Sequence, residues 1–186
     1  ADTVNKWIFL NESGQPIEWH PLNGRGLRFS PYNLSTTVSG WNLVSLPRTA
    51  PDRMLTHVYP NAGSKAFAYD RGYIPGDTLA DGVGYWVKMN SAQNIPVAGT
   101  EILLDSITVR QGWNLVGSIS KPVPVGTITS DPINILTTFF YGYNGGYFQA
   151  DTIQPAKGYW IKANEPGKMI YSAGTVAKPT AERYFE

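Results

Sequence analysis

Residues 40–44 read GWNLV, and the same five letters recur at 112–116. Residues 84–90 read GYWVKMN and return as GYWIKAN at 158–164. The two offsets are 72 residues (113 − 41) and 74 residues (160 − 86), so a loop between the motifs absorbs two residues. Self-similarity at a nearly fixed offset is the signature of a repeated structural unit. We therefore predict that the chain contains two copies of one module.

The segments between these motifs also match and indicate strands. Residues 67–73, FAYDRGY, align with 141–147, YGYNGGY, and 77–79, DTL, align with 151–153, DTI. Aromatic residues beside turn formers favour short strands, and the Gly-containing tips predict hairpins in which Gly supplies the positive φ. The side chains of the run from Tyr85 to Met89 are expected to alternate between the two faces, as in a half-buried strand.

We expect an all-β protein made of two homologous antiparallel modules, each a small sandwich or barrel, packed with approximate two-fold symmetry. One helical turn is expected within 51–59 and another within 131–138, where Asp131 and Pro132 suit a helix start. Near the N-terminus, 7–10 and 17–19 read as a β-hairpin and 27–29 as a third strand. The expected organisation is an N-terminal β-hairpin segment, module 1, module 2 and a tail, at 1–36, 37–105, 106–178 and 179–186.

Composition argues against several functional classes. The 186 residues carry a net charge of +1 with no basic cluster, which disfavours nucleic-acid binding. No Cys is present, so disulfides and thiolate sites are excluded. No apolar run of about 18 residues exists, so membrane insertion is not expected. A low charged fraction of 16% with many turn formers is typical of secreted or cell-surface β proteins.

No catalytic or metal-binding pattern stands out in the sequence. His20 and His57 have no metal spacing, and neither a nucleophile elbow nor a phosphate loop is present. We predict no enzyme activity, no cofactor and no metal site. Asp77 and Asp151 precede Thr in both copies, which favours turn capping, with calcium as the alternative.

The repeated aromatic residues are the candidates for ligand binding. We expect Trp41 and Trp113 to be core residues whose Gly neighbours give them room, and one ring of each Tyr-Trp pair to face outward. Exposed rings stack on the apolar faces of sugars while amides bond the hydroxyls. The alternative is that these rings only pack a β core. The predicted ligand-binding residues are Trp86, Tyr85, Trp160, Tyr159, Tyr73 and Tyr147, with Asn90 and Asn164 as polar partners, and Trp7 or Trp19 as a separate platform.

The succession GWNLVSLP, an aromatic hairpin, DTL and GYWVK resembles a tandem repeat module of large secreted proteins from Bacteroidetes- and Ignavibacteria-like bacteria. The resemblance covers about residues 38–176. It implies a non-catalytic accessory module beside other domains of the same polypeptide. The expected function is a carbohydrate-binding accessory module of a secreted polysaccharide-active protein, with a polysaccharide as partner. The alternative is a structural or adhesion spacer of a cell-surface protein with no sugar ligand.

Overall fold

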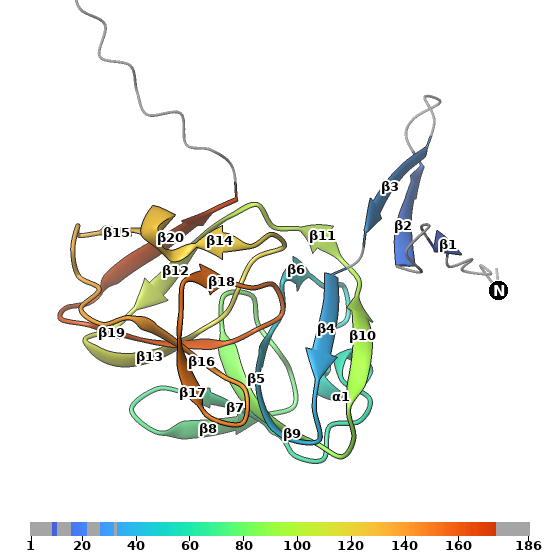
Figure 1. Ribbon diagram of the computed structural model, residues 1–186, viewed down its shortest axis with the longest axis horizontal. Coiled ribbons are helices and arrows are strands. Elements are labelled where there is room, and N and C mark those ends of the chain that lie inside the picture. The colour runs from blue at the N-terminus through green and yellow to red at the C-terminus, as the bar shows by residue number, and fades with distance from the viewer. Residues whose placement is uncertain (1–8, 11–15, 22–26, 32, 174–186) are drawn as a thin grey trace, which may run out of the picture.

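The computed structural model describes residues 9–10, 16–21, 27–31 and 33–173, which form an all-β protein with antiparallel sheets (Figure 1). This confirms the predicted fold class. Near the N-terminus, β1 (Phe9–Leu10), β2 (Pro16–Pro21) and β3 (Leu27–Pro31) form one antiparallel sheet, as the hairpin prediction required. Trp19 lies on β2, whereas Trp7 and the predicted tail at 179–186 lie outside the described residues.

The first half of the body, residues 33–101, is built on a four-stranded sheet with the order β5-β9-β7-β8. A second sheet pairs β4 with β10, so this half includes residues from Asn33 onward, before the boundary expected at 37. The strands are β4 (Asn33–Thr37), β5 (Gly40–Ser45), β7 (Ala66–Tyr69), β8 (Tyr73–Gly76), β9 (Gly84–Met89) and β10 (Gln93–Val97).

The second half, residues 104–172, repeats this arrangement with the order β13-β19-β16-β17. Its second sheet has the order β12-β20-β15, in which β12 and β20 pair as β4 and β10 do. The strands are β12 (Leu104–Val109), β13 (Gly112–Val116), β15 (Thr129–Asp131), β16 (Phe140–Tyr143), β17 (Tyr147–Ala150), β19 (Tyr159–Ala163) and β20 (Gly167–Ser172).

Short elements connect these sheets. The helical turn expected within 51–59 is present as α1 (Leu55–Val58). The one expected within 131–138 is wrong, because Asn134 has a φ of 63° and the chain forms a turn there instead of a helix. The remaining elements are β6 (Arg48–Thr49), which pairs with β11 (Thr100–Glu101), β14 (Val123–Pro124), which pairs with β18 (Thr152–Ile153), and the 3₁₀ turn η1 (Val125–Thr127).

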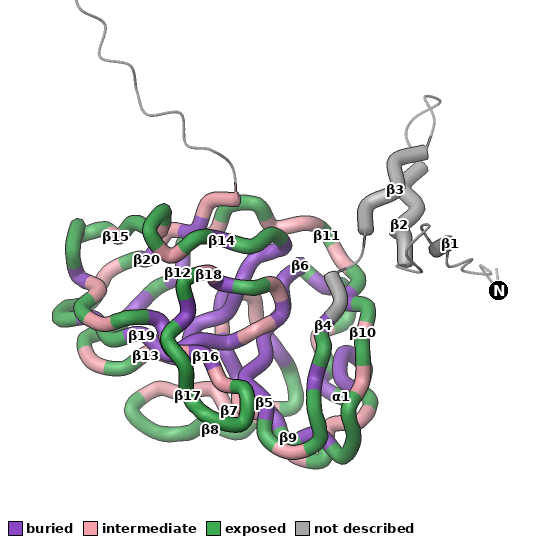
Figure 2. Tube along the Cα trace, in the orientation of Figure 1, coloured by how far each residue is buried: buried purple, intermediate pink, exposed green. Residues whose placement is uncertain are grey.

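Each half has its own hydrophobic core, and a third cluster lies between the halves. Buried residues such as Val44, Leu46 and Val87 form the core of the first half, while Ile119, Ile161 and Met169 belong to that of the second. Figure 2 shows these buried stretches inside the body. The third cluster contains Leu43, Leu115 and Trp160, with half-buried aromatic rings packed against it. The two sheets therefore meet through apolar side chains.

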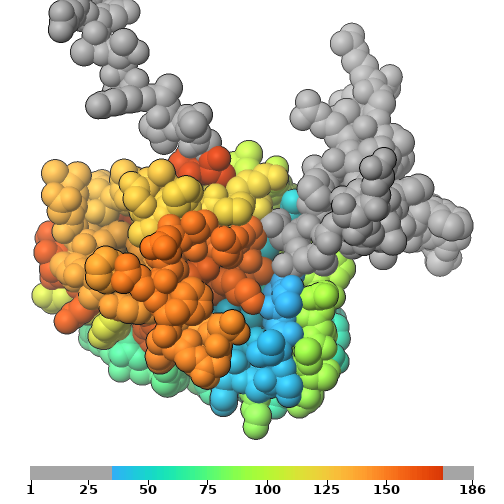
Figure 3. Space-filling model, viewed as in Figure 1, coloured from blue at the N-terminus to red at the C-terminus, as the bar shows by residue number. Residues whose placement is uncertain are grey.

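The contacts between the halves are reciprocal. Val44 bridges Lys157, and the equivalent positions Val116 and Val83 form the matching bridge. Gly84 and Gly158, the first residues of the two GYW motifs, lie in this contact. A Cβ at Gly84 would lie 2.6 Å from the carbonyl oxygen of Val116, and one at Gly158 would lie 3.1 Å from that of Val44. Gly is thus needed where the two backbones approach. Figure 3 shows atoms of the two halves packed against each other.

Candidate ligand-binding face

The Gly-Trp-Asn motif holds its Trp at the surface. Gly40 has a φ of 92°, which only Gly adopts freely. The Asn42 amide donates to the carbonyl oxygens of Val38 (2.8 Å) and Gly40 (2.9 Å), and its oxygen accepts the Val38 N–H (3.0 Å). The second half repeats these three bonds around Asn114. The motif therefore fixes a turn and the direction in which Trp41 leaves it.

Trp41 and Trp113 are not the core residues that the sequence led us to expect. Each is 44% exposed, and each lies opposite an exposed lysine, Lys88 or Lys162, in the strand register. The expectation that Gly gives the ring room is also wrong, since a Cβ at Gly40 or at its equivalent would contact nothing within 4 Å. The Gly is required for its backbone angle, and the Trp is presented to solvent.

The Tyr-Trp pairs point to opposite sides of their strands. Tyr85 is buried in the core of the first half, where its hydroxyl accepts the Ala80 N–H at 2.9 Å. Tyr159 is buried likewise and accepts the Gln154 N–H at 2.9 Å. Burial raises the pKa of both phenols. Neither ring offers a surface to a ligand, so both drop out of the candidate site.

The two Trp residues of these pairs lie on the other side of the strands, and each contacts several aromatic rings. Trp86 meets Trp41 edge-on, with ring centres 6.3 Å apart at 89°. Trp160 meets Trp113 in the same way, at 6.3 Å and 88°. Each exposed Trp also packs against a ring of the neighbouring hairpin, Trp41 against Phe67 and Trp113 against Tyr141. These edge-to-face arrangements are the ones aromatic pairs prefer, so the rings support one another at the surface.

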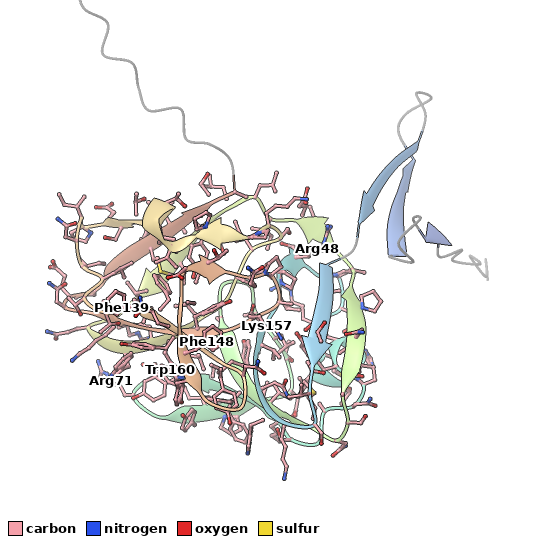
Figure 4. All side chains as sticks on the ribbon, in the orientation of Figure 1. Arg48, Arg71, Phe139, Phe148, Lys157 and Trp160 are labelled. Atoms are coloured by element: carbon pink, nitrogen blue, oxygen red, sulfur yellow. The ribbon has the colours of Figure 1, made fainter. Side chains whose placement is uncertain are left out.

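Ring contacts also cross from one half to the other. The ring centres of Tyr143 and Trp86 are 4.8 Å apart, and those of Tyr69 and Trp160 are 4.9 Å apart. Figure 4 shows Trp160 close to the hairpin tip that carries Arg71. The ring contacts form two sets of five residues, each with members from both halves, and the two sets share the lining of the hollows described below, so we call them together the aromatic face. Its ten members are Trp41, Phe67, Tyr69, Tyr73, Trp86, Trp113, Tyr141, Tyr143, Tyr147 and Trp160.

Two hollows open on the aromatic face, and rings line both of them. The first hollow has a volume of about 410 Å³ and the second about 570 Å³. Tyr73 lines both, and it is one of the most exposed aromatic residues together with Tyr147. The first is lined by Trp41, Phe67, Tyr73, Trp86 and Tyr143, and the second by Tyr69, Tyr73, Trp113, Tyr141, Tyr147 and Trp160.

Tyrosine hydroxyls and indole N–H groups are the polar groups of these hollows. Burial raises the pKa of Tyr147, and the neighbouring Tyr73 raises it further. None of the ten residues of the aromatic face is Lys, Arg, His, Asp or Glu, so the face has hydrogen-bonding groups but no charged side chain of its own.

The two predicted amide partners lie elsewhere. The side chain of Asn90 packs beside Gly63, and its backbone N–H donates to the carbonyl oxygen of Asn61 at 2.9 Å. The backbone N–H of Asn164 donates to the carbonyl oxygen of Ile135 at 2.9 Å. Neither residue lines a hollow of the aromatic face. Of the predicted residues, the face includes Trp86, Trp160, Tyr73 and Tyr147.

Sequence reasoning missed Trp41 and Trp113 as surface residues. The usable signal was the Asn after each Trp, because Asn favours turns through bonds to nearby backbone, and a turn opens a strand end to solvent. Reading that signal requires the pairing of β5 with β9, which places Trp41 opposite Lys88. The register is a property of the folded sheet, and the linear pattern does not contain it.

The described residues contain no group of three or more His, Cys, Asp or Glu side chains that could hold a metal ion. Asp77 pairs with Lys65, whose Nζ lies 2.6 Å from its carboxylate. Within the same part of the chain, no helix is long and apolar enough to cross a membrane.

No protein-family model, curated protein or solved structure matches this chain.

Proposed function

We propose that this protein is a non-catalytic carbohydrate-binding module of a secreted polysaccharide-active protein, and that the aromatic face is its binding surface. The observation that carries the proposal is the exposure of Trp41 and Trp113 beside hollows lined by further rings. Large exposed aromatic patches mark interaction sites. Planar rings with a few hydroxyl and N–H groups at their edges suit the alternating apolar and polar surfaces of a pyranose.

The roles follow from position. Trp41 and Trp113 act as stacking platforms at the two ends of the face, because each offers a ring to solvent. Tyr73 and Tyr147 lie between them and present their hydroxyls to the hydroxyls of the sugar. Trp86 and Trp160 hold the platforms at the angles given above. An extended glycan that contacts both platforms would therefore cross the boundary between the halves.

The proposal includes the absence of catalysis at this face. Glycoside hydrolysis ordinarily requires two carboxyl groups on either side of the scissile bond. Among the described residues that line the two hollows, none is Asp or Glu. The face therefore has groups for stacking and hydrogen bonding but lacks the pair of carboxyl groups that most glycosidases use.

The second candidate function is a structural spacer of a cell-surface protein. The apolar character of the two hollows favours it, because a neighbouring domain of the same polypeptide would bury such a surface. In that case the rings are a packing surface and no glycan binds. The two candidates differ in one measurable property, which is the retention of the isolated chain on polysaccharide.

The test is a pull-down of the chain on insoluble cellulose, xylan, mannan and chitin, repeated with Trp41→Ala, Trp113→Ala and Phe139→Ala. Phe139 is the matched control, since its ring is 58% exposed but lies outside the aromatic face. We expect at least one polysaccharide to retain the wild type and the control. Each Trp variant should bind roughly tenfold more weakly, the change produced by about 1.4 kcal/mol.

Folding is checked by thermal melting, because both Trp residues are half exposed and their loss should shift the Tm by only a few degrees. Retention on none of the polysaccharides would favour the spacer. An equal loss of binding in Phe139→Ala would show that the aromatic face is not the site.

A further inference from the structure

A third pocket, of about 310 Å³, adjoins the first hollow at the boundary between the halves. Trp41 and Tyr143 line both, so a ligand on the first hollow extends directly into this pocket. Figure 3 shows the boundary, where atoms of the second half meet those of β4. We call it the Lys157 pocket, and its further lining residues include Asn144, Phe148, Gln154 and Lys157.

The other side of the boundary has an equivalent pocket of about 290 Å³, whose charged lining residues are Asp70, Arg71 and Arg110. There, Arg110 and Asp70 form an ion pair at 2.5 Å. The positions equivalent to Arg110 and Asp70 are Val38 and Asn144, by the offsets of 72 and 74 residues (110 − 72 and 70 + 74). The ion pair is therefore missing from the Lys157 pocket. Conversely, the position equivalent to Lys157 is Val83 (157 − 74), which carries no charge.

Lys157 is a half-buried cation without a counter-charge among the described residues. Its Nζ donates to the carbonyl oxygen of Thr36, and no carboxylate that the structure describes forms an ion pair with it. Among the described lining residues of the pocket, none is Asp or Glu. An ammonium group has three donors, so Lys157 keeps donors for a ligand. Burial lowers its pKa, which an anion beside it would oppose.

The remaining walls of the pocket suit a sugar ring. Trp41, Tyr143 and Phe148 supply aromatic surface, and the Phe148 ring lies over Gly142, where a Cβ would meet it at 2.5 Å. Asn144 and Gln154 are exposed and have amide groups for hydroxyls. In Figure 4, Phe148 and Lys157 both lie where the second half faces the first. The pocket thus combines aromatic walls, amides and one positive charge.

We infer that the Lys157 pocket is a subsite for a carboxylate-bearing sugar, so that the module prefers acidic polysaccharides of the uronic acid class. This inference rests on the proposed carbohydrate-binding function. The sugar carboxylate accepts a charge-assisted hydrogen bond from Lys157, while the next sugar of the chain stacks on Trp41. The equivalent pocket is lined by Arg71 and by the ion pair of Asp70 and Arg110, so it contains a carboxylate that the Lys157 pocket lacks.

The experiment compares soluble oligomers of polygalacturonate, mannuronate-rich alginate and glucuronan with their own methyl esters, which lack the negative charge and carry one added methyl group. Titration calorimetry should show at least one acid form binding roughly five- to tenfold more tightly than its ester, and this difference should shrink at high salt. Lys157→Met should remove the difference, because binding of the acid form weakens more than binding of the ester. Lys168→Met is the matched control on β20 and should keep it, although it loses the same charge.

Asn144→Asp is the second variant, because it places in this pocket the carboxylate that Asp70 places in the other. It should weaken binding of the acid form more than binding of the ester. Esters that bind as well as their acids, or a preference that survives Lys157→Met, would overturn the inference while leaving the proposed function standing. If Lys168→Met loses the preference for the acid form as completely as Lys157→Met does, the preference comes from net charge, and the inference is overturned as well. Failure of every acid and every ester would remove both proposals.

Discussion

The two halves share their backbone-determining residues and differ where they face each other. Both have a Gly with positive φ before the Trp, an Asn that closes the same turn and a buried Tyr that accepts a backbone N–H. In contrast, the ion pair of Asp70 and Arg110 on one side of the boundary is replaced by Asn144 and Val38 on the other. The comparison indicates that strand geometry needs particular residues, whereas the surfaces between the halves tolerate change.

Among equivalent positions, we expect Trp86 and Trp160 to differ most in how much their replacement lowers the free energy of unfolding. Trp160 is only 9% exposed and belongs to the cluster between the halves, so Trp160→Ala should lower the free energy of unfolding by about 3–5 kcal/mol. Trp86→Ala should cost clearly less, because part of its ring is open to solvent. Denaturant unfolding of both variants measures the two costs. Equal costs would mean that the boundary buries both rings alike.

A strongly alkaline pH should unfold the protein through its buried phenols. Burial raises the pKa of Tyr59 to about 12, so the fold favours its neutral form. Its contribution to stability is complete below pH 10 and is lost as the pH rises from about 10 to 12, by roughly 3 kcal/mol. Urea unfolding at pH 9 and pH 11.5, for the wild type and Tyr59→Phe, tests this. Stability that falls equally in both proteins would show that other groups cause the loss.

Tyr59 in the first half and Tyr171 in the second are both fully buried. Their stabilities should respond differently to loss of the hydroxyl group. The Tyr59 hydroxyl bonds Ser35 at 3.2 Å and the carbonyl oxygen of Ser45 at 3.3 Å, so Tyr59→Phe should cost about 1 kcal/mol. The Tyr171 hydroxyl is buried with no hydrogen-bond partner among the described residues, so Tyr171→Phe should be neutral or stabilising. Thermal melts of the two variants test this prediction. A larger loss of stability in Tyr171→Phe than in Tyr59→Phe would contradict it.

The smallest expected effect separates the two hairpin tips. Position 71 has a φ of 60° with Arg, and the equivalent position 145 has a φ of 76° with Gly. The expectation that Gly supplies the positive φ therefore holds only for the second tip. Arg71→Gly should stabilise the first hairpin by about 0.5 kcal/mol, and Gly145→Ala should destabilise the second by about 1 kcal/mol. Chemical denaturation measures both, and a destabilising Arg71→Gly would show that Arg71 makes contacts that outweigh its backbone strain.

The local predictions succeeded where short-range chemistry decides. The alternation around Tyr85 predicts a strand with one ring on each side, and the structure has β9 there with Tyr85 in the core. The expected hairpins at 70–72 and 144–146 are present. That the halves are separate modules with the expected boundaries remains a prediction, and so do the sugar ligand and the secreted location.

The predictions that failed depended on which side of a sheet a residue occupies. The expectation of a buried Trp41 rested on its apolar side chain and its Gly neighbour, and the structure exposes it. Asn90 and Asn164 had the right chemistry for sugar hydroxyls but lie away from the aromatic face. Distances along the chain do not indicate which residues meet across strands, so the composition of the surface could not be predicted residue by residue.

The sequence alone determined the class of fold, the internal repeat and the turns, because these depend on side-chain alternation and on backbone angles that Gly and Asn permit. Only the tertiary structure decided that the two sheets meet through Gly84 and Gly158, that rings of both halves form one face, and that Lys157 lies in a pocket whose described lining residues include no carboxylate. The physical reason is distance, because each of these features joins residues of one half to residues of the other, 32 or more positions apart in the chain (116 − 84), and only packing brings them together.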